Sequence, residues 1–127
     1  MPTEPEPTTA TQRWPAEWLR GVLEVCTLAV LADGPAHGYA VASRLETAGL
    51  GQIKGGTLYP LLTRLETGGL LTSSWEAGGA GPGRKVFTIT GEGTRALAER
   101  ADLWAAFTSV ATELIHARSG QRQGTTP

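Results

Sequence analysis

The sequence KGGTLYPLLTRLETGG, residues 54–69, carries the start, the end and two unlike faces of one helix. Thr57 is a candidate N-cap, and Pro60 suits a first helical turn because its missing N–H would be unpaired there. Gly68 and Gly69 supply the left-handed backbone at which many helices end. Apolar residues recur at i, i+3, i+4 and i+7 and so share one side: Leu58, Leu61, Leu62 and Leu65. The stretch therefore predicts a short helix held in place by leucines.

The opposite side of this helix is polar. It presents Tyr59, Thr63, Arg64, Glu66 and Thr67, and Lys54 stands just before the helix. A short helix that packs through leucines and exposes Tyr, Thr and Arg suits insertion into a DNA groove. An ordinary surface helix has the same pattern, so the following segments decide between the two.

Two strands with a glycine-rich turn between them are predicted after the helix. Residues 70–76 and residues 85–90 have the composition and alternation of strands. The segment GGAGPGR, residues 78–84, is too rich in glycine for regular structure and is basic at its far end. A helix followed by such a hairpin is the winged form of helix-turn-helix, whose tip lies along the phosphate backbone. A nucleotide site is disfavoured, because no Gly-Lys-Ser/Thr and no helix follow the glycines directly.

Two helices are predicted before this unit. The first covers residues 15–32, with an apolar face at helical spacing: Trp18, Leu19, Val22, Leu23, Cys26, Ala29 and Val30. The second covers residues 37–46, and His37 is expected to cap it or to lie in its turn. The connection from there to Lys54 has the length that a helix-turn-helix requires.

A long helix is predicted over residues 94–118, after the sequence TGEG. Its broad apolar stripe contains Leu97, Ala101, Trp104, Ala111, Leu114 and Ile115, and one edge of the stripe contains Leu103, Phe107, Val110 and Leu114. A helix of about 25 residues is about 37 Å long, more than so small a domain can cover with its own core. We therefore expect a partner chain on this helix; the alternative is that the helix folds back over its own domain.

Composition indicates one small domain with modest charge. The 127 residues are 40% hydrophobic, and domains of this size gain from a partner subunit because they bury a small share of their surface. The net charge is −1, but residues 36–90 hold five basic residues against three acidic ones. That balance predicts weak non-specific DNA binding.

The ends of the chain and its single cysteine point to a cytoplasmic protein. Residues 1–13 and 119–127 are polar and expected to be disordered, and the first of these lacks the pattern of a signal peptide. The longest apolar run, residues 22–32, is too short to cross a bilayer. Cys26 is the only cysteine, which excludes an intrachain disulfide and favours a buried inert thiol over a redox sensor.

The sequence holds no constellation typical of an enzyme. It contains no nucleophile–base pair or paired carboxylates, and His37 and His116 belong to separate elements. Neither histidine has a cysteine or carboxylate beside it at metal-ligand spacing. We therefore expect no catalysis, no metal and no cofactor.

Several motifs, taken in order, resemble the PadR family of bacterial transcriptional regulators. They are HGY at residues 37–39, GTLYPLLTRLE at 56–66, GLL at 69–71, GRKVF at 83–87 and ITGEG at 89–93. The central string is specific, whereas the glycine motifs are informative only in this order. The resemblance covers about residues 19–115. It implies a winged-helix domain, a C-terminal dimerisation helix, repression of transcription and release from DNA by a small phenolic or drug-like molecule.

Carried over position by position, the resemblance assigns Tyr59, Thr63 and Arg64 to the DNA-facing side of the recognition helix. It assigns Arg84 and Lys85 to the basic wing, and the helix from Thr94 to dimerisation. Two departures exist. The family often has an aromatic pair where this chain has Val86 and Phe87, and the single last helix matches only the family's short members, so effector pockets of larger members are not carried over.

We therefore expect a mainly α fold with a small β-hairpin: a winged helix-turn-helix over residues 14–90 and a dimerisation helix over residues 91–118. It would be a homodimeric repressor that binds double-stranded DNA at a pseudo-palindromic operator. The predicted DNA-binding residues are Tyr39, Lys54, Thr57, Tyr59, Thr63, Arg64, Arg84 and Lys85. Of these, Lys54, Arg84 and Lys85 would bind phosphates, and Arg64 a guanine or a phosphate. The alternative is a winged-helix module that binds protein, which would lack salt-dependent DNA affinity.

The predicted dimer interface contains Trp18, Leu19, Leu103, Phe107, Val110 and Leu114. Trp104 and Phe107 are a candidate site for a small aromatic effector, because two indoles close to a dimer axis would form a flat slot. A tryptophan that only packs in the interface is the favoured alternative.

Overall fold

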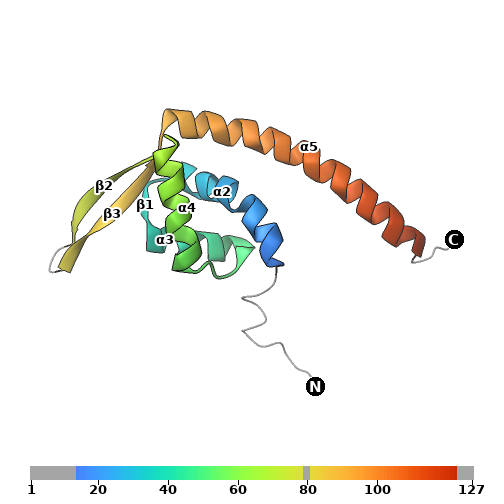
Figure 1. Ribbon diagram of the computed structural model, residues 1–127, viewed down its shortest axis with the longest axis horizontal. Helices are drawn as coiled ribbons and strands as arrows, with labels where there is room; N and C mark the ends of the chain where they lie inside the picture. Colours follow the sequence, from blue (N-terminus) through green and yellow to red (C-terminus); the bar gives the residue numbers. More distant parts are fainter. Residues whose placement is uncertain (1–13, 79–80, 123–127) are drawn as a thin grey trace, which may run out of the picture. The chain divides into compact units, whose positions relative to one another are not determined.

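A computed structural model describes residues 14–78 and 81–122 of the protein. The elements are α2 (Ala16–Ala32), β1 (Ala36–His37), α3 (Gly38–Leu45), the wide turn η1 (Glu46–Leu50), α4 (Gly55–Thr67), β2 (Leu71–Gly78), β3 (Gly81–Ile89) and α5 (Gly91–Arg122) (Figure 1). They form two compact units, one ending at Leu97 and one beginning at Ala98, which are described separately. The fold is mainly helical with a small antiparallel sheet, as predicted.

The core of the first unit is built from α2, α3, α4 and the sheet. All four leucines predicted to hold α4 are buried, and Leu62 is fully inaccessible. They join Leu28 and Leu31 of α2, Val41 of α3 and Phe87 of β3 in one cluster. Burial of a leucine stabilises a fold by about 1.5–3 kcal/mol, so these side chains fix α4 firmly against the rest.

The buried face of α2 differs from the predicted one. Leu23, Thr27, Leu28 and Leu31 are buried, whereas Trp18 is 65% exposed and Ala29 is exposed. The helix is apolar on more than one side, so hydrophobic spacing alone does not determine which side packs inward. Trp18 is therefore on the surface of this unit.

Helix α4 begins at Gly55, and its N-cap lies three residues before the predicted N-cap, Thr57. Lys54 is its N-cap without a side-chain hydrogen bond, and its carbonyl accepts the N–H groups of Thr57 at 3.0 Å and Leu58 at 2.9 Å. Thr57 is therefore in the first turn, and Pro60 lies further inside the helix rather than in that turn. Proline removes the hydrogen bond to the carbonyl four residues earlier, that of Gly56, and both residues are exposed to water.

The C-terminus of α4 is a complete Schellman motif. The N–H of Gly69 donates to the Glu66 carbonyl at 3.0 Å, and the N–H of Leu70 donates to the Leu65 carbonyl at 2.9 Å. Gly69 has a φ of 83°, which a side chain would strain. The paired glycines thus end the helix as predicted, with Gly69 as the left-handed residue.

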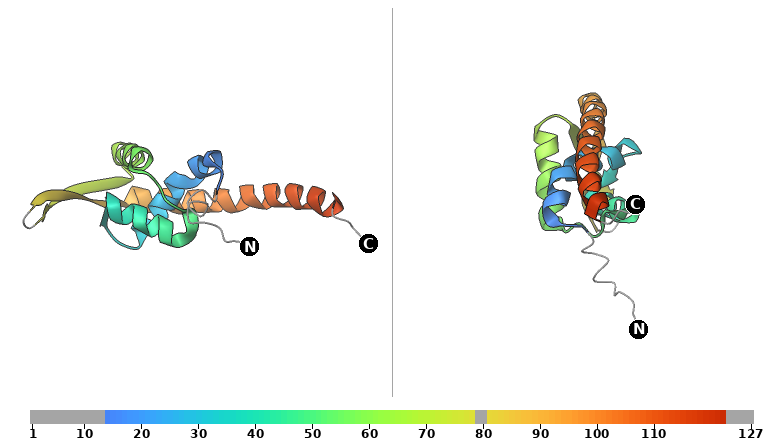
Figure 2. Two further views of the ribbon diagram at one scale, coloured as in Figure 1. Left: turned by 90° about the horizontal axis from the view of Figure 1, so that it is seen from below. Right: turned by 90° about the vertical axis from the view of Figure 1, so that its right-hand side faces the viewer.

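The sheet has the order β1-β3-β2, and all of its pairs are antiparallel. The strands β2 and β3, here called the wing, extend beyond the helices of the first unit (Figure 2). Strand β3 already begins at Gly81, where the sequence predicted irregular structure: Gly81 pairs with Gly78 and Arg84 with Glu76, with a register shift between these pairs. Positions 79–80 of the tip lie outside the described residues. Gly83 permits close pairing, because a Cβ there would lie 2.7 Å from the Glu76 carbonyl oxygen.

Helix α3 is joined to its neighbours by two side chains. His37 caps it, as predicted: its Nδ1 accepts the N–H of Ala40 at 3.3 Å. His37 also belongs to β1, a two-residue strand that the sequence did not predict and that pairs with Val86 and its neighbour on β3. Arg44 donates to the carbonyl oxygens of Val30 at 3.2 Å and Gly34 at 2.9 Å, and so closes the end of α2.

Helix α5 begins at Gly91 and continues to Arg122, beyond both ends predicted for it. Thr90 explains the early start, because its Oγ1 accepts the N–H of Gly93 at 2.9 Å as an N-cap and donates to the Gly69 carbonyl at 2.7 Å. Gly93 leaves no room for a side chain against the backbone of Leu70. The TGEG sequence thus attaches the start of α5 to the end of α4. The tails predicted to be disordered fall outside the described residues, except for the last turn of α5.

Candidate nucleic-acid interface

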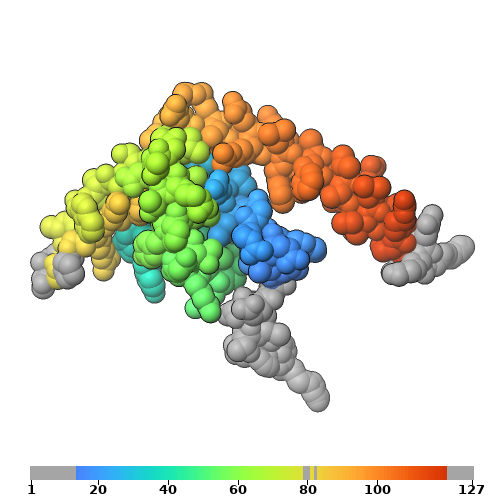
Figure 3. Space-filling model, viewed as in Figure 1, coloured from blue at the N-terminus to red at the C-terminus, as the bar shows by residue number. Residues whose placement is uncertain are grey.

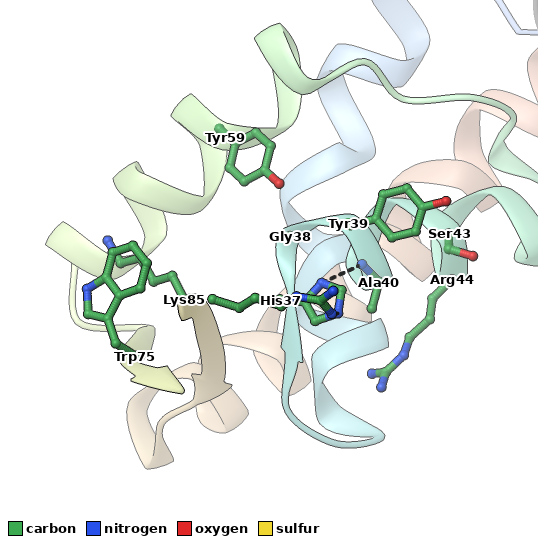
Figure 4. A pocket seen from close by; sticks show the side chains of 10 residues that line it. His37, Gly38, Tyr39, Ala40, Ser43, Arg44, Tyr59, Trp75 and Lys85 are labelled. Atoms are coloured by element: carbon green, nitrogen blue, oxygen red, sulfur yellow. Dashed lines mark hydrogen bonds between the residues drawn. The ribbon is translucent and has the colours of Figure 1, made fainter. Parts of the chain in front are cut away.

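The start of α3, the side of α4 and the wing line an open groove of about 970 Å³, here called the wing groove (Figure 4). Its lining residues are His37, Gly38, Tyr39, Ala40, Ser43, Arg44, Tyr59, Trp75, Arg84 and Lys85. Three of these described residues are cationic and none is acidic. Aromatic rings between cations form a surface suited to the sugar–phosphate backbone of a nucleic acid.

Tyr59 enters the wing groove from α4 and lies on Gly38. A Cβ at position 38 would meet the ring hydroxyl of Tyr59 at 2.6 Å, so glycine is required for this contact. The ring is still 50% exposed, and the 76% exposed Tyr39 lies on the same groove. The HGY and TLYP motifs therefore meet in space: one supplies the small residue on which the aromatic residue of the other rests.

Arg84 approaches His37 from the wing, with 3.1 Å between Arg84 Nη1 and His37 Nε2. His37 Nδ1 is also 3.3 Å from the N of Ala40, and a neutral imidazole has only one acceptor nitrogen, so the two contacts compete for it. The Arg84 contact is therefore one that a phosphate can replace.

Lys85 is tied to α4 through an acidic side chain. Its Nζ lies 3.4 Å from Oε1 of Glu66, and Oε2 of Glu66 accepts a hydrogen bond of 2.6 Å from the Ser73 hydroxyl. The Ser73 hydrogen bond, and to a smaller degree the Lys85 charge, lower the pKa of Glu66. Glu66 thus stays charged and faces the wing.

Arg64 lies on the opposite side of α4 from Tyr59. Its Nη2 is 3.4 Å from Oε2 of Glu24 on α2, and both side chains are partly exposed. The five-residue separation between positions 59 and 64 turns them about 140° apart on a helix. Arg64 is therefore outside the wing groove, although both side chains are exposed.

The other predicted DNA-facing residues of α4 are also outside the wing groove. Lys54 and Thr57 line a second, smaller hollow of about 260 Å³ together with Trp14, Leu19 and Arg20 of the first unit. Thr63 is exposed, and its hydroxyl donates to the Tyr59 carbonyl at 3.0 Å. Of the eight predicted DNA-binding residues, the structure brings four together: Tyr39, Tyr59, Arg84 and Lys85.

Trp75 is a groove residue that was not among the predicted DNA-binding residues. It pairs with Lys85 across the wing and is 71% exposed. Figure 4 shows its indole ring on β2, flanking the groove on the side of the wing. The alternation of residues along β2 determines which side of the strand Trp75 lies on. Which residues of β3 lie beside it follows only from the register between β2 and β3.

The second unit, the part of α5 from Ala98 onward, exposes most of its large apolar side chains. Leu103 is 70% exposed and Phe107 is 65% exposed. Val110, Leu114 and Ile115 are also exposed, and the Trp104 ring lies 6.1 Å from that of Phe107. Contiguous apolar surface of this kind marks interaction sites in soluble proteins.

Other chemistry has little support in the residues described. No group of three or more metal-ligating side chains occurs in residues 14–78 and 81–122. None of the helices in this part of the chain is long and apolar enough to span a membrane. Cys26 is half-buried, and burial raises the pKa of its thiol, which keeps it protonated and weakly reactive.

Comparisons with known proteins agree with this geometry. Residues 27–99 match the transcriptional regulator PadR-like family. A PadR family transcriptional regulator from Eggerthella lenta DSM 2243 is 39% identical, with a TM-score of 0.72 over 79% of this chain and 87% of that chain. A PadR-like transcriptional regulator from Bacillus cereus strain ATCC 14579 is 30% identical, with a TM-score of 0.68 over 78% and 96% of the two chains. No curated protein matches the chain significantly.

Proposed function

Because the chain belongs to the PadR-like family of transcriptional regulators, we propose that it is a sequence-specific DNA-binding repressor that acts as a homodimer. The observation that carries the DNA-binding part is the wing groove. Four residues from three elements, Tyr39, Tyr59, Arg84 and Lys85, converge there beside the exposed side of α4. Such a repressor works in the cytoplasm, where bacterial DNA lies.

In the proposed complex, α4 enters the major groove and the wing follows the adjacent backbone. Arg84 and Lys85 bind phosphates on the wing side, and Lys54 binds one at the start of α4. Arg64 leaves Glu24 to reach a base edge or a phosphate, since an exposed ion pair of this kind contributes only about 0–1 kcal/mol. Contacts to bases come from α4, and contacts to phosphates fix its position.

The test is binding to the DNA upstream of the chain's own gene, measured by fluorescence anisotropy over a range of salt concentrations. We expect tight binding that weakens with salt, and a log–log salt slope that is flatter by about one in Arg84→Ala. The matched control is Arg118→Ala on α5, a residue that does not line the groove, which should leave the slope unchanged. A protein-binding module would show no salt-dependent DNA affinity, and that result would contradict the proposal.

The homodimer proposal rests on α5. Leu103, Phe107, Val110 and Leu114 form one row at helical spacing, and each is more than half exposed in the single chain. Trp18, 65% exposed on α2, and the half-buried Leu19 are proposed to pack against the long helix of the partner. Burying these side chains against a second copy would remove a large apolar area from water.

We also propose a small planar aromatic effector that binds beside Trp104 and relieves repression. Trp104 is 44% exposed and Phe107 lies next to it, so two copies around a two-fold axis would form a slot for a flat ring. A flat hydrophobic dye should quench tryptophan fluorescence and weaken DNA binding, and Trp104→Ala should abolish both effects. If quenching persists in an intact Trp104→Ala dimer, Trp104 is only a packing residue.

A further inference from the structure

The side of α4 that faces away from the core carries no charged or amide side chain. The residues opposite the leucines are Gly56, Pro60, Thr63 and Thr67, at the spacing i, i+4, i+7 and i+11. All four are exposed. Figure 3 shows α4, in yellow-green, on the surface turned toward the viewer. These four residues are called the outer strip.

Tyr59 and the charged side chains of α4 lie on its flanks, where contacts within the chain hold them. Tyr59 rests against Gly38 on one flank. Glu66 lies toward the wing, where it binds Ser73 and Lys85. Arg64 is paired with Glu24 on the other flank. The outer strip between these flanks is left with small and apolar groups.

Thr63 is the one outer-strip residue near the middle of α4 with a hydroxyl, and the donor function of that hydroxyl is already used. It donates to the Tyr59 carbonyl at 3.0 Å. The groups that Thr63 has left for a ligand are its methyl group and the acceptor lone pairs of its hydroxyl oxygen, and Pro60 offers only its apolar ring. In the major groove, the base feature that such apolar groups recognise is the 5-methyl group of thymine.

We propose that α4 reads thymine through apolar contacts from Thr63 and Pro60. This inference rests on the proposed function, since it requires α4 to enter the major groove. Gly56, which also belongs to the outer strip, has no side chain and so lets the helix backbone approach the bases closely. The operator half-site then has thymine opposite the middle of α4, and hydrogen bonds to base edges come from the flanks of the helix.

The experiment uses the full chain and a duplex that it selects from a random-sequence pool. Each thymine of the selected site is replaced in turn by deoxyuridine, which removes only the 5-methyl group. Affinity of the wild-type protein should fall about fourfold at one or two positions of each half-site, the value of one buried methyl group. Thymines elsewhere in the site should tolerate the change.

Two variants of Thr63 assign the contact. Thr63→Ser keeps the hydroxyl that bonds to Tyr59 but lacks the methyl group, so it should bind the thymine duplex about fourfold more weakly and be indifferent to uracil at one position. Thr63→Val lacks the hydroxyl but keeps a methyl group, so it should still distinguish thymine from uracil. Pro60→Ala should lose the distinction at a neighbouring position.

The outcomes separate this inference from the function on which it rests. If uracil is neutral at every position, or Thr63→Ser distinguishes the bases as well as the wild type does, thymine reading by Thr63 is wrong. Specific binding to the selected duplex would nevertheless leave the proposed function standing. If the pool yields no selected sequence, the proposed function fails as well.

Discussion

Three cations on or beside α4 have a partner within the chain. Arg64 is paired with Glu24, Lys85 with Glu66, and Arg84 meets the ring of His37. Exposed ion pairs contribute little to stability and are easily exchanged, so a phosphate can replace each partner. In the proposed complex, these contacts hold the side chains near the DNA before it binds, which lowers the entropy cost of ordering them.

Mutation of Arg64 distinguishes its two proposed roles in DNA binding. Arg64→Ala should cost about 1–3 kcal/mol and relax specificity at one base if Arg64 reads a base edge, or flatten the salt slope by about one if it binds a phosphate. Glu24→Gln releases Arg64 and should tighten DNA binding by up to about fivefold. Anisotropy titrations of both variants and of the double variant measure this.

The double variant is the control in that series. If Glu24→Gln acts through Arg64, its effect should disappear in the Arg64→Ala background. An equal gain in both backgrounds would mean that removal of a negative charge near DNA is responsible. Unchanged affinity of Arg64→Ala at low and high salt would remove Arg64 from the interface.

Gly38 should influence DNA binding through Tyr59. Alanine at position 38 would overlap the Tyr59 ring, which can swing away at its flexible end. We expect Gly38→Ala to weaken DNA binding by about the same factor as Tyr59→Ala, while the double variant loses no more than either alone. Gly21→Ala, on α2, is the matched control, because a Cβ at position 21 meets no atom within 4 Å. Additive losses would show that the two residues act separately.

Glu66 links the wing to α4 in a manner that depends on pH. Because its pKa is lowered in the folded protein, the stabilisation is present at neutral pH and is lost as pH falls below 4.5 through the folded-state value. Glu66→Gln should therefore be slightly less stable than the wild type at pH 7, and the difference should vanish in acid. Denaturant unfolding at several pH values measures it. Ser73→Ala should remove most of the difference, since Ser73 is the larger cause.

At the scale of elements, patterns within one segment of sequence predicted the features that depend on interactions within that segment. The four leucines set the core side of α4, and the glycine pair set its end, because both act within one helix. Strand β1 depends on pairing with residues about 50 positions away, and the wing register depends on pairing between two separate strands; no pattern within one segment specifies either. The same limit applies to Arg64: the leucines predicted its exposure, but its pairing with Glu24 of α2 joins residues 40 positions apart.

The connection between α4 and α5 should be a stability determinant of the first unit. Thr90→Ala removes the N-cap of α5 and the hydrogen bond to Gly69, and should cost about 1 kcal/mol, which lowers Tm by about 4–8 °C. Gly93→Ala should cost more, because its Cβ would overlap the Leu70 carbonyl. Thermal unfolding followed by circular dichroism checks both.

The matched control for this pair is Thr94→Ala. Thr94 is exposed, and its hydroxyl only donates to the Thr90 carbonyl within the helix, at 3.1 Å. Its replacement should change the free energy of unfolding by no more than about 0.5 kcal/mol. A Tm loss in Thr94→Ala equal to that in Thr90→Ala would contradict the special role of Thr90.

At the scale of the whole molecule, the first unit has a core of its own and the second is one helix. The exposed apolar row on α5 is the feature that predicts assembly. The helical spacing of the apolar residues predicted this row from the sequence. The spacing does not identify which surface packs against the row. We propose that α5 and the exposed Trp18 of a second copy pack against this row.

Phe107→Glu should break the dimer. A carboxylate buried in an apolar interface without a partner costs several kcal/mol, so the variant should sediment as a monomer at micromolar concentration. It should also lose tight DNA binding, since a single recognition helix remains per particle. Thr112→Glu, on the exposed side opposite Phe107, should stay dimeric. A wild-type monomer with tight DNA binding would contradict the assembly.

The central claim is that two copies of this chain place two α4 helices in successive major grooves of one operator. The most direct measurement is the affinity for the selected duplex and for the same duplex with five extra base pairs between its half-sites. Half a helical turn moves one half-site to the other side of the DNA, so affinity should fall by about 100-fold or more. Equal affinity for the two duplexes, or for a single half-site, would contradict the account.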